Sequence, residues 1–445
     1  MSRAVAGTVL AAVAVALLSA APRVLLASGT LPELLRPFIW SDALLTYERG
    51  LSGHRLPYRD SPFEYPPLVG AFSGLLSLAS SDATLYVLLW GLVVAAFAGA
   101  GAAVLARAAG PRRTLAYWSL APHLLLLGGV NFDVLATALL VVAAVAQRSG
   151  RELAAMLGLA AGTATKLFPL ASVPVTLLGG QRRIAASAVF LATLLAFYLP
   201  TLPLPYSSAG GIGRYAASIG ANIDSVWGLA ERALAALGVP DAALVIVVVT
   251  TTGVVATYLL HVLPHARRAS DPVLSFGLAT TVLLFWSRLY SPQYSLWLLP
   301  FFVLLPLSAR RFALLTVADI GVFVTVYPLT LVPRSPDDGV RDAAAGRDRG
   351  RVARPRAGGL TARRRSTKSA ALPSSSAAAK EIAQPEEQRS PSACAVRRAM
   401  SISASKKSPR HGRLAAPGHG RAPRRRPRQP AGGRLAGGRP NTARR

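Results

Sequence analysis

The sequence predicts an all-α polytopic membrane protein, and three observations support this class. The chain has 445 residues, of which 52% are hydrophobic and only 16% are charged, whereas soluble domains carry roughly 25% charged residues. Long apolar segments recur throughout residues 1–333. Short arginine clusters separate several of these segments, as expected of cytoplasmic loops between membrane helices. The folded domain is therefore predicted to lie in a membrane.

The first apolar segment, residues 1–27, begins with the basic Arg3 and carries small residues at Ser19-Ala20-Ala21. This pattern resembles a secretory signal peptide. The apolar run exceeds 20 residues, however, and many further apolar segments follow it. We expect an uncleaved first helix with a cytoplasmic N-terminus.

Eleven further apolar segments are expected to form helices. They lie at about 66–80, 83–106, 114–129, 132–147, 153–165, 167–179, 184–204, 241–263, 272–287, 292–307 and 312–332. A spanning helix needs about 20 residues, so several of these must be tilted or broken. Arginine clusters occur at 107/112/113, 148/151, 182/183, 267/268 and 310/311. All five can face the cytoplasm together with Arg3 if segment 66–80 re-enters without crossing. This gives about eleven crossings, or twelve if 66–80 spans.

The first loop, residues 28–65, is polar and rich in Tyr and Pro. Five acidic residues lie in it: Glu33, Asp42, Glu48, Asp60 and Glu64. It is either a solvated acidic connector or part of a site. The predicted topology puts this loop outside, together with the corner at 131–133, the break at Lys166, the loop 205–225 and the turn at 288–293. Ionisable groups within or beside membrane helices are costly and usually mark a site, so five polar corners on one face favour a site there.

Two of these corners interrupt apolar runs. Asn131 and Asp133 can cap a helix N-terminus, and capping does not exclude a role in a site. Lys166, near Pro169, either snorkels to the interface or faces an anionic phosphate. His123 is more readily explained as an interface histidine than as a ligand.

The other two corners also allow two interpretations. Arg288 lies between aromatic residues, which is typical of an interfacial belt, and it also suits bidentate contact with a phosphate. In the loop 205–225, Arg214 and Asp224 are candidate binding residues, while Asp224-Ser225 also reads as a helix start. Trp227 could stack on a sugar or sit at the interface.

Common soluble motifs are missing from the sequence. It contains no phosphate-binding glycine loop, no His-Glu-x-x-His zinc pattern and no nucleophile elbow. It also has no Asp-x-Asp pair of the kind that holds a nucleotide-sugar metal. An enzyme of this composition would take a lipid-linked donor more readily than a cytoplasmic nucleotide, with no cofactor and no metal ligands assigned.

Several motifs together resemble glycosyltransferase family 87. They are Asp42, Gly53…Pro57-Tyr58…Glu64-Tyr65-Pro66-Pro67-Leu68, Asn131-Phe132-Asp133, Lys166-Leu167-Phe168-Pro169 and Ser291-Pro292-Gln293-Tyr294 followed by Trp297-Leu298-Leu299-Pro300. The resemblance covers roughly residues 1–332. It implies the GT-C membrane fold, with short surface helices in the first outer loop. It also implies transfer of mannose from a polyprenyl phosphate to a glycolipid or glycan acceptor at the outer face of the plasma membrane.

The resemblance also implies site residues. Asp42 occupies the position of the acidic base in the first outer loop. The substrate-binding candidates are Tyr58, Glu64, Tyr65, Asn131, Asp133, Lys166, Arg214, Asp224, Arg288, Gln293 and Tyr294. A carboxylate can deprotonate an acceptor hydroxyl, and Lys166, Arg214 or Arg288 can stabilise the leaving phosphate.

Residues 334–445 differ in composition from the membrane domain, 1–333. They hold 28 of the 49 Lys and Arg and only 7 of the 20 acidic residues, together with the single cysteine, Cys394. The basic excess therefore gives no reason to expect nucleic acid as a partner of the membrane domain. A tail rich in Arg, Pro, Ala and Ser cannot bury a core. It is either a frameshift product or a disordered tail that binds anionic lipid or cell-wall polymer.

A non-catalytic membrane protein, such as a lipid or polysaccharide transporter, is the alternative function. A transporter is expected to hold its polar groups near the bilayer midplane and to open to both sides. This sequence instead gathers them at one face, which favours the transferase.

Overall fold

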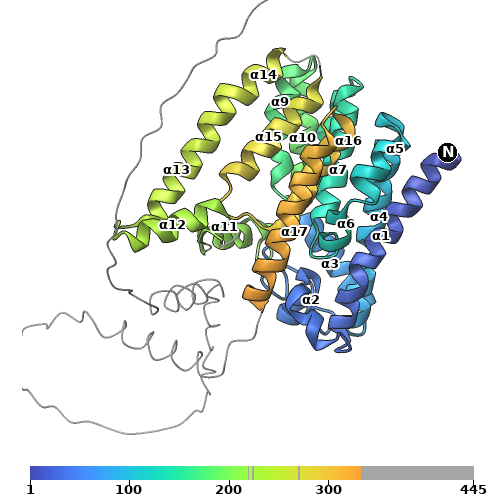
Figure 1. Cartoon of the computed structure of the whole chain (residues 1–445), viewed down its shortest axis with the longest axis vertical. Coiled ribbons are helices and arrows are strands. Elements are labelled where there is room, and N and C mark those ends of the chain that lie inside the picture. Colours follow the sequence, from blue (N-terminus) through green and yellow to red (C-terminus); the bar gives the residue numbers. More distant parts are fainter. Residues whose placement is uncertain (219, 223–224, 269–270, 332–445) are drawn as a thin grey trace, which may run out of the picture. The chain divides into compact units, whose positions relative to one another are not determined.

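The computed structural model describes residues 1–218, 220–222, 225–268 and 271–331. Throughout these ranges the regular structure is helical (Figure 1), which confirms the all-α membrane class. The basic tail 334–445 lies outside the described residues. The helices coincide closely with the expected apolar segments, because uninterrupted apolar runs in a membrane must satisfy their backbone groups within the helix itself.

Four described helices are long and apolar enough to cross a membrane: Arg3–Ala27, Ala83–Ala109, Arg183–Thr201 and Ala242–Arg268. The first two are α1 and α4, and they pack along each other. Small residues allow this approach, since a Cβ on Gly91 would lie 2.7 Å from the Cβ of Ala20. The third span is α10 (Arg183–Tyr198) with a short turn, and the fourth is α13 (Ala242–Thr257), a π-helical turn and α14 (Leu263–Arg268).

The other expected segments form shorter or broken helices. They are α3 (Pro67–Ala79), α5 (Pro111–Thr114) with α6 (Pro122–Leu127), α7 (Asp133–Arg148), α8 (Glu152–Thr163), α9 (Val173–Gly179), α15 (Pro272–Trp286), α16 (Leu299–Leu304) and α17 (Ala309–Leu331). A helix of 12 to 15 residues, such as α8 or α15, is about 18–23 Å long. That is shorter than the roughly 30 Å hydrocarbon core. Eleven or twelve full crossings therefore remain a prediction.

Helix α3 does not carry the chain away from the first loop. At its start, a Cβ on Gly70 would lie 2.3 Å from the ring of Tyr58. At its end, the Ser77 hydroxyl donates to the Leu51 carbonyl at 2.7 Å. The first loop therefore contacts both ends of α3; whether segment 66–80 re-enters or spans stays a prediction.

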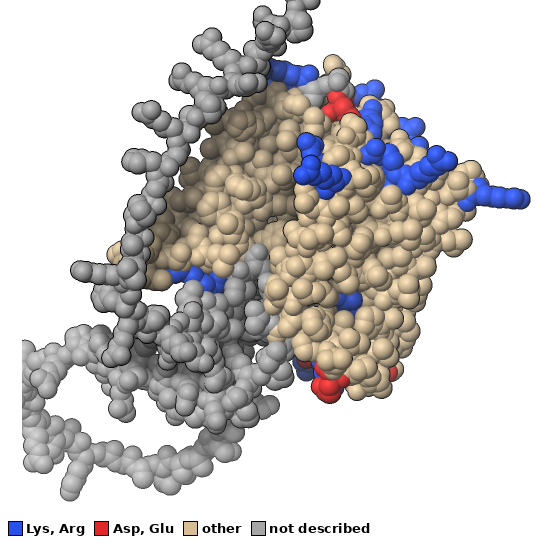
Figure 2. All heavy atoms as spheres, in the orientation of Figure 1, with Lys and Arg blue, Asp and Glu red and all other residues tan. Residues whose placement is uncertain are grey.

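The arginine clusters lie together at one end of the helices. Arg113 of α5 donates to the carbonyls of Phe302, Val303 and Leu305 at the end of α16. Arg148 pairs with Asp271, which precedes α15, at 2.5 Å. Figure 2 shows most of the visible Lys and Arg side chains at the end where α5 and α14 lie, with some acidic atoms among them, and further acidic side chains at the opposite end, near α2.

The acidic end is formed by the first loop, which carries the expected short helices. These are a 3-10 helix at Glu33–Phe38, α2 (Asp42–Thr46) and a π-helical turn at Tyr47–Leu51. Two further helices, α11 (Ser208–Ser218) and α12 (Val226–Ala236), were not among the expected segments. The Ser225 hydroxyl accepts from the Gly228 amide at 2.8 Å and caps α12, so the expected helix start is confirmed at Ser225, while Asp224 lies outside the described residues.

Candidate active site

Asp42 is fixed by the backbone around it. The Ser41 hydroxyl accepts from the Leu44 amide at 3.1 Å and caps α2, as Ser does at helix N-termini. The Asp42 amide donates to the Val130 carbonyl at 2.8 Å. This bond joins the first loop to the corner between α6 and α7, although 88 residues separate the two positions in the chain.

The Asp42 carboxylate has two side-chain donors. Trp40 Nε1 donates to Oδ1 at 2.5 Å, and the Tyr65 hydroxyl donates to Oδ2 at 2.7 Å. Burial raises the pKa of Asp42 above its ordinary value, while the bonds from Trp40 and Tyr65 and the charge of Lys166 act in the opposite direction. A carboxylate held in this way, with a raised pKa, is suited to accept a proton.

Asp133 and Lys166 form an ion pair close enough to Asp42 for both to influence its charge. Lys166 Nζ lies 2.6 Å from Asp133 Oδ1, and the Lys166 side chain is 18% exposed. Trp297 Nε1 donates to the same oxygen at 2.9 Å. Asp133 is fully buried, and its other oxygen has no hydrogen-bond partner among the described residues. Lys166 is therefore the member of this pair that a ligand can reach.

Three stacked rings line one side of the ion pair. Phe168 stacks on Trp297 with ring centroids 3.9 Å apart, and Tyr294 stacks on Trp297 at 4.3 Å. Lys166 Nζ lies 4.7 Å from the centroid of the Tyr294 ring, within the range of a cation–π interaction. The stack therefore places an aromatic surface beside the Lys166 ammonium group.

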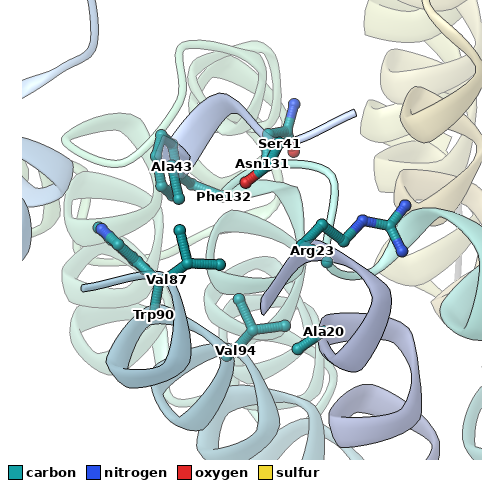
Figure 3. Close-up of a pocket in the computed structure, with 11 residues that line it drawn as sticks. Ala20, Arg23, Ser41, Ala43, Val87, Trp90, Val94, Asn131 and Phe132 are labelled. Atoms are coloured by element: carbon teal, nitrogen blue, oxygen red, sulfur yellow. The ribbon is translucent and has the colours of Figure 1, made fainter. Parts of the chain in front are cut away.

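The corner before α7 supports this arrangement. Asn131 Oδ1 accepts from the Asp133 amide at 2.9 Å and fixes the turn before the helix. The N-cap position of α7 is Phe132, which makes no side-chain cap bond, so the expected N-cap role of Asn131 and Asp133 is wrong. The ring of Phe132 packs edge-on against Tyr65 at 4.9 Å and against Trp90 at 4.4 Å. A cavity beside this corner is lined by α1, α2, α4 and the corner itself, and Figure 3 labels Asn131 among its residues.

Tyr58 and Glu64 lie around Tyr65. Tyr58 is buried and its hydroxyl donates to the Tyr65 carbonyl at 2.7 Å; burial raises its pKa. Glu64 lies 3.6 Å from Arg49, and burial raises the pKa of Glu64 against the charge of Arg49. Tyr58 therefore holds the backbone of Tyr65 in place by its hydrogen bond. Glu64 remains partly exposed.

The remaining predicted residues lie around the 287–293 turn or outside the described part. Gln293 is buried and its Oε1 accepts from the Ser291 hydroxyl at 2.7 Å. The Arg288 carbonyl accepts from the Asn222 amide at 2.8 Å, which ties the 205–222 loop to this turn. The side chain of Arg214 and all of Asp224 lie outside the described residues. Trp227 stacks on Trp286 at 5.0 Å.

The structure adds residues that the sequence analysis missed. Arg23 is buried within α1 and donates to three backbone carbonyls; its position as a charge inside an apolar helix was a usable signal. Asp319 of α17 lies 3.0 Å from His123 and accepts from the Tyr290 hydroxyl at 3.0 Å. His123 is thus a buried partner of a carboxylate.

The site is therefore assembled from motifs that lie far apart in the sequence. The carboxylate of Asp42, the Lys166–Asp133 pair and the stacked rings of Trp297 and Tyr294 come from four separate segments. Among the described residues, no three His, Cys, Asp or Glu side chains gather as a metal site would require.

The family model of glycosyltransferase family 87 matches residues 63–292. This chain belongs to glycosyltransferase family 87. The protein is thus a multi-pass membrane glycosyltransferase, which acts on a sugar donor and an acceptor. No curated protein and no solved structure in the comparisons matches this chain.

The range matched by the family model contains some of the candidate site residues but not all of them. It contains Tyr65, the corner at 131–133 and Lys166, and it ends before Tyr294. Asp42 precedes it. In this family 87 glycosyltransferase, Asp42 is joined to the matched region by its bonds to Tyr65 and Val130.

Proposed function

We propose that this glycosyltransferase moves a mannosyl residue from a polyprenyl-phosphate donor to a glycolipid or glycan acceptor at the outer face of the membrane. The observation that carries the proposal is the juxtaposition of a hydrogen-bonded carboxylate, Asp42, with the partly exposed ammonium group of Lys166. The choice of mannose as the sugar and of a polyprenyl phosphate as its carrier rests on the family resemblance.

Asp42 is the proposed general base. The acceptor hydroxyl gives its proton to the carboxylate as its oxygen attacks the anomeric carbon, and the bond from that carbon to the phosphate oxygen breaks. The two bonds from Trp40 and Tyr65 hold the carboxylate in one orientation, which lowers the cost of reaching the reactive geometry. A single displacement of this kind inverts the anomeric centre.

Lys166 is the proposed partner of the leaving phosphate. Its ammonium group is oriented by Asp133 and by the Tyr294 ring, yet 18% of its side chain stays exposed. A preoriented cation stabilises charge that develops on a leaving group more effectively than one that must first be ordered. Asp133 is then a positioning residue, since it is fully buried, and Tyr294 offers an aromatic face for a sugar.

The placement of the active site at the outer face rests on the distribution of charged residues. The arginine clusters lie at the end opposite the acidic first loop (Figure 2), and arginine-rich short loops stay in the cytoplasm. Asp42 and Lys166 would then face the side on which lipid-linked sugars, but not cytoplasmic nucleotide sugars, are available.

Replacing Asp42 with Asn tests the base. The substitution keeps the side chain's size and its ability to accept a bond from Trp40, but an amide cannot take the proton. We expect kcat to fall by at least about 100-fold, with unchanged expression and thermal stability in detergent. Asp60→Asn, in the same loop but exposed, is the matched control and should retain transfer. Near-normal transfer by Asp42→Asn would remove Asp42 from the base role.

A donor panel tests the substrate. Purified protein should transfer sugar from a synthetic polyprenyl-phosphate mannose, but not from a nucleotide-linked mannose. Polyprenyl-phosphate glucose separates the sugar from the carrier: transfer from the glucose donor at an equal rate would argue against mannose specificity while leaving the lipid-phosphate donor in place.

A further inference from the structure

We infer that Arg23 is a positioning residue that aligns the first loop with the corner before α7 and thereby orients Asp42. The inference rests on the proposed role of Asp42 as the base. It concerns a residue that lies inside the first membrane helix and contacts three separate segments.

The contacts of Arg23 join both halves of the site. Its Nε donates to the Trp40 carbonyl at 3.1 Å, and its Nη2 donates to the Leu126 carbonyl at 2.8 Å. Its Nη1 donates to the Ser19 carbonyl of its own helix at 2.6 Å. One rigid guanidinium therefore fixes the loop two residues before Asp42 and the α6 end that leads to the corner.

The link from Arg23 to Asp42 runs through Trp40. Arg23 holds the backbone of Trp40, and the indole of the same residue donates to the Asp42 carboxylate at 2.5 Å. A second connection runs through the corner, because the Asp42 amide donates to the carbonyl of Val130, four residues after Leu126. Both the backbone and the side chain of Asp42 thus depend on segments that Arg23 holds.

The burial of Arg23 argues that these contacts matter. The residue is 2% exposed, and a guanidinium removed from water needs well-placed acceptors to offset its lost hydration. The planar fork of arginine can donate to carbonyls in several fixed directions, whereas the ammonium group of lysine is a compact point charge on a flexible stem. Figure 3 shows Arg23 beside the cavity that Ser41 and Asn131 also line.

The first test is the pH profile of transfer. The Trp40 bond favours the charged form of Asp42, so losing it should move the acid limb of kcat to higher pH. Arg23→Met should show this shift and lower kcat by about 100-fold, with a smaller change in KM for the polyprenyl-phosphate mannose donor. The other groups that influence Asp42 are Tyr65, Lys166, Asp133 and, by its charge, Glu64; they are unaltered by the substitution.

Trp40→Phe tests the same link without changing α1, since it keeps one aromatic ring and removes the pyrrole ring that carries the donating N–H. It should shift the limb in the same direction, and the double variant Arg23→Met/Trp40→Phe should shift it no further than the larger single shift. Arg23→Lys should recover part of the activity. Additive shifts in the double variant would overturn the inference, because they would show two independent effects.

Arg113→Met is the matched control. Arg113 also donates to three backbone carbonyls, but these lie at the arginine end. Its loss should lower stability without moving the acid limb. An equal loss of kcat with an unmoved limb in both arginine variants would reduce Arg23 to a structural residue and overturn the inference. If Arg23→Met does not fold, Arg23→Lys and Trp40→Phe carry the same comparison.

Hydrogen exchange separates this inference from the proposed function. The Asp42 amide is protected by its bond to Val130, so peptides covering residues 28–46 should exchange faster in Arg23→Met but not in Arg113→Met. This measurement needs no substrate. Absence of mannose transfer by the unaltered protein would overturn the proposed function, whereas unchanged exchange in Arg23→Met would overturn the role of Arg23.

Discussion

Breaking the buried pair of Asp133 and Lys166 should destabilise the protein, and removing both charges together should cost less stability than the two single substitutions added together. Asp133→Asn leaves Lys166 facing a neutral amide. Lys166→Met leaves a buried carboxylate whose second oxygen has no hydrogen-bond partner in the part of the chain that the structure describes. Removing one partner of a buried pair costs about 3–5 kcal/mol, because the remaining charge is uncompensated.

The structure sets the expected magnitude within that range. The Asp133 side chain is fully buried, but 18% of the Lys166 side chain is exposed, so water screens the pair in part. We expect each single substitution to lower the free energy of unfolding by about 3 kcal/mol. The double variant should lose less than the sum, with a coupling energy of about 2 kcal/mol. The measurement is reversible unfolding in mixed micelles.

Asp271→Asn provides the comparison. Asp271 pairs with Arg148 at 2.5 Å, but the two side chains are 40% and 29% exposed, and such pairs contribute about 1 kcal/mol or less. Losses below about 1 kcal/mol for both single substitutions at the buried pair would refute the reasoning. So would single losses that simply add in the double variant, since additivity means that the two charges do not stabilise each other.

Three further outcomes follow from the site. Transfer should fall as the pH drops through the pKa of Asp42, and burial puts this loss at higher pH than for an ordinary aspartate, as the acid limb of the rate profile will report. Tyr65→Phe removes a bond that favours the charged carboxylate and should move that limb higher still. Gly70→Ala adds a Cβ 2.3 Å from the Tyr58 ring and should lower stability by about 1–3 kcal/mol, measured by thermal unfolding in detergent.

Each of these three predictions can be contradicted by a specific result. An acid limb at the position of an ordinary aspartate would show that burial does not govern Asp42. An unmoved limb in Tyr65→Phe would mean that the hydroxyl bond is not made in solution. Gly213→Ala, where an added Cβ meets no atom within 4 Å, is the control for Gly70→Ala, and an equal loss in both would trace the effect to helix chemistry and not to Tyr58.

The amino-acid sequence by itself determined the membrane class, the positions of most helices and the grouping of arginines at one end. These properties depend on local composition: an apolar run in lipid must become a helix, and arginines between such runs stay on one side. The order of the motifs also indicated the family, which the match over residues 63–292 establishes.

Only the tertiary structure decided how the polar corners pair with one another. In the sequence, Asp133 and Lys166 were two independent binding candidates, and Trp297 was part of a motif without a role; folding joins all three through one carboxylate oxygen. Such pairing depends on how helices cross, and sequence spacing does not encode it for residues 33 to 164 positions apart.

The contacts of Arg23 also became visible only in the tertiary structure. Its charge within the first helix is visible in the sequence, yet its acceptors are backbone carbonyls, which every residue carries. No pattern of side chains can identify them. Only the packing of α1 against the first loop and the end of α6 shows which carbonyls a buried guanidinium reaches, because burial forces each of its donors to find an acceptor nearby.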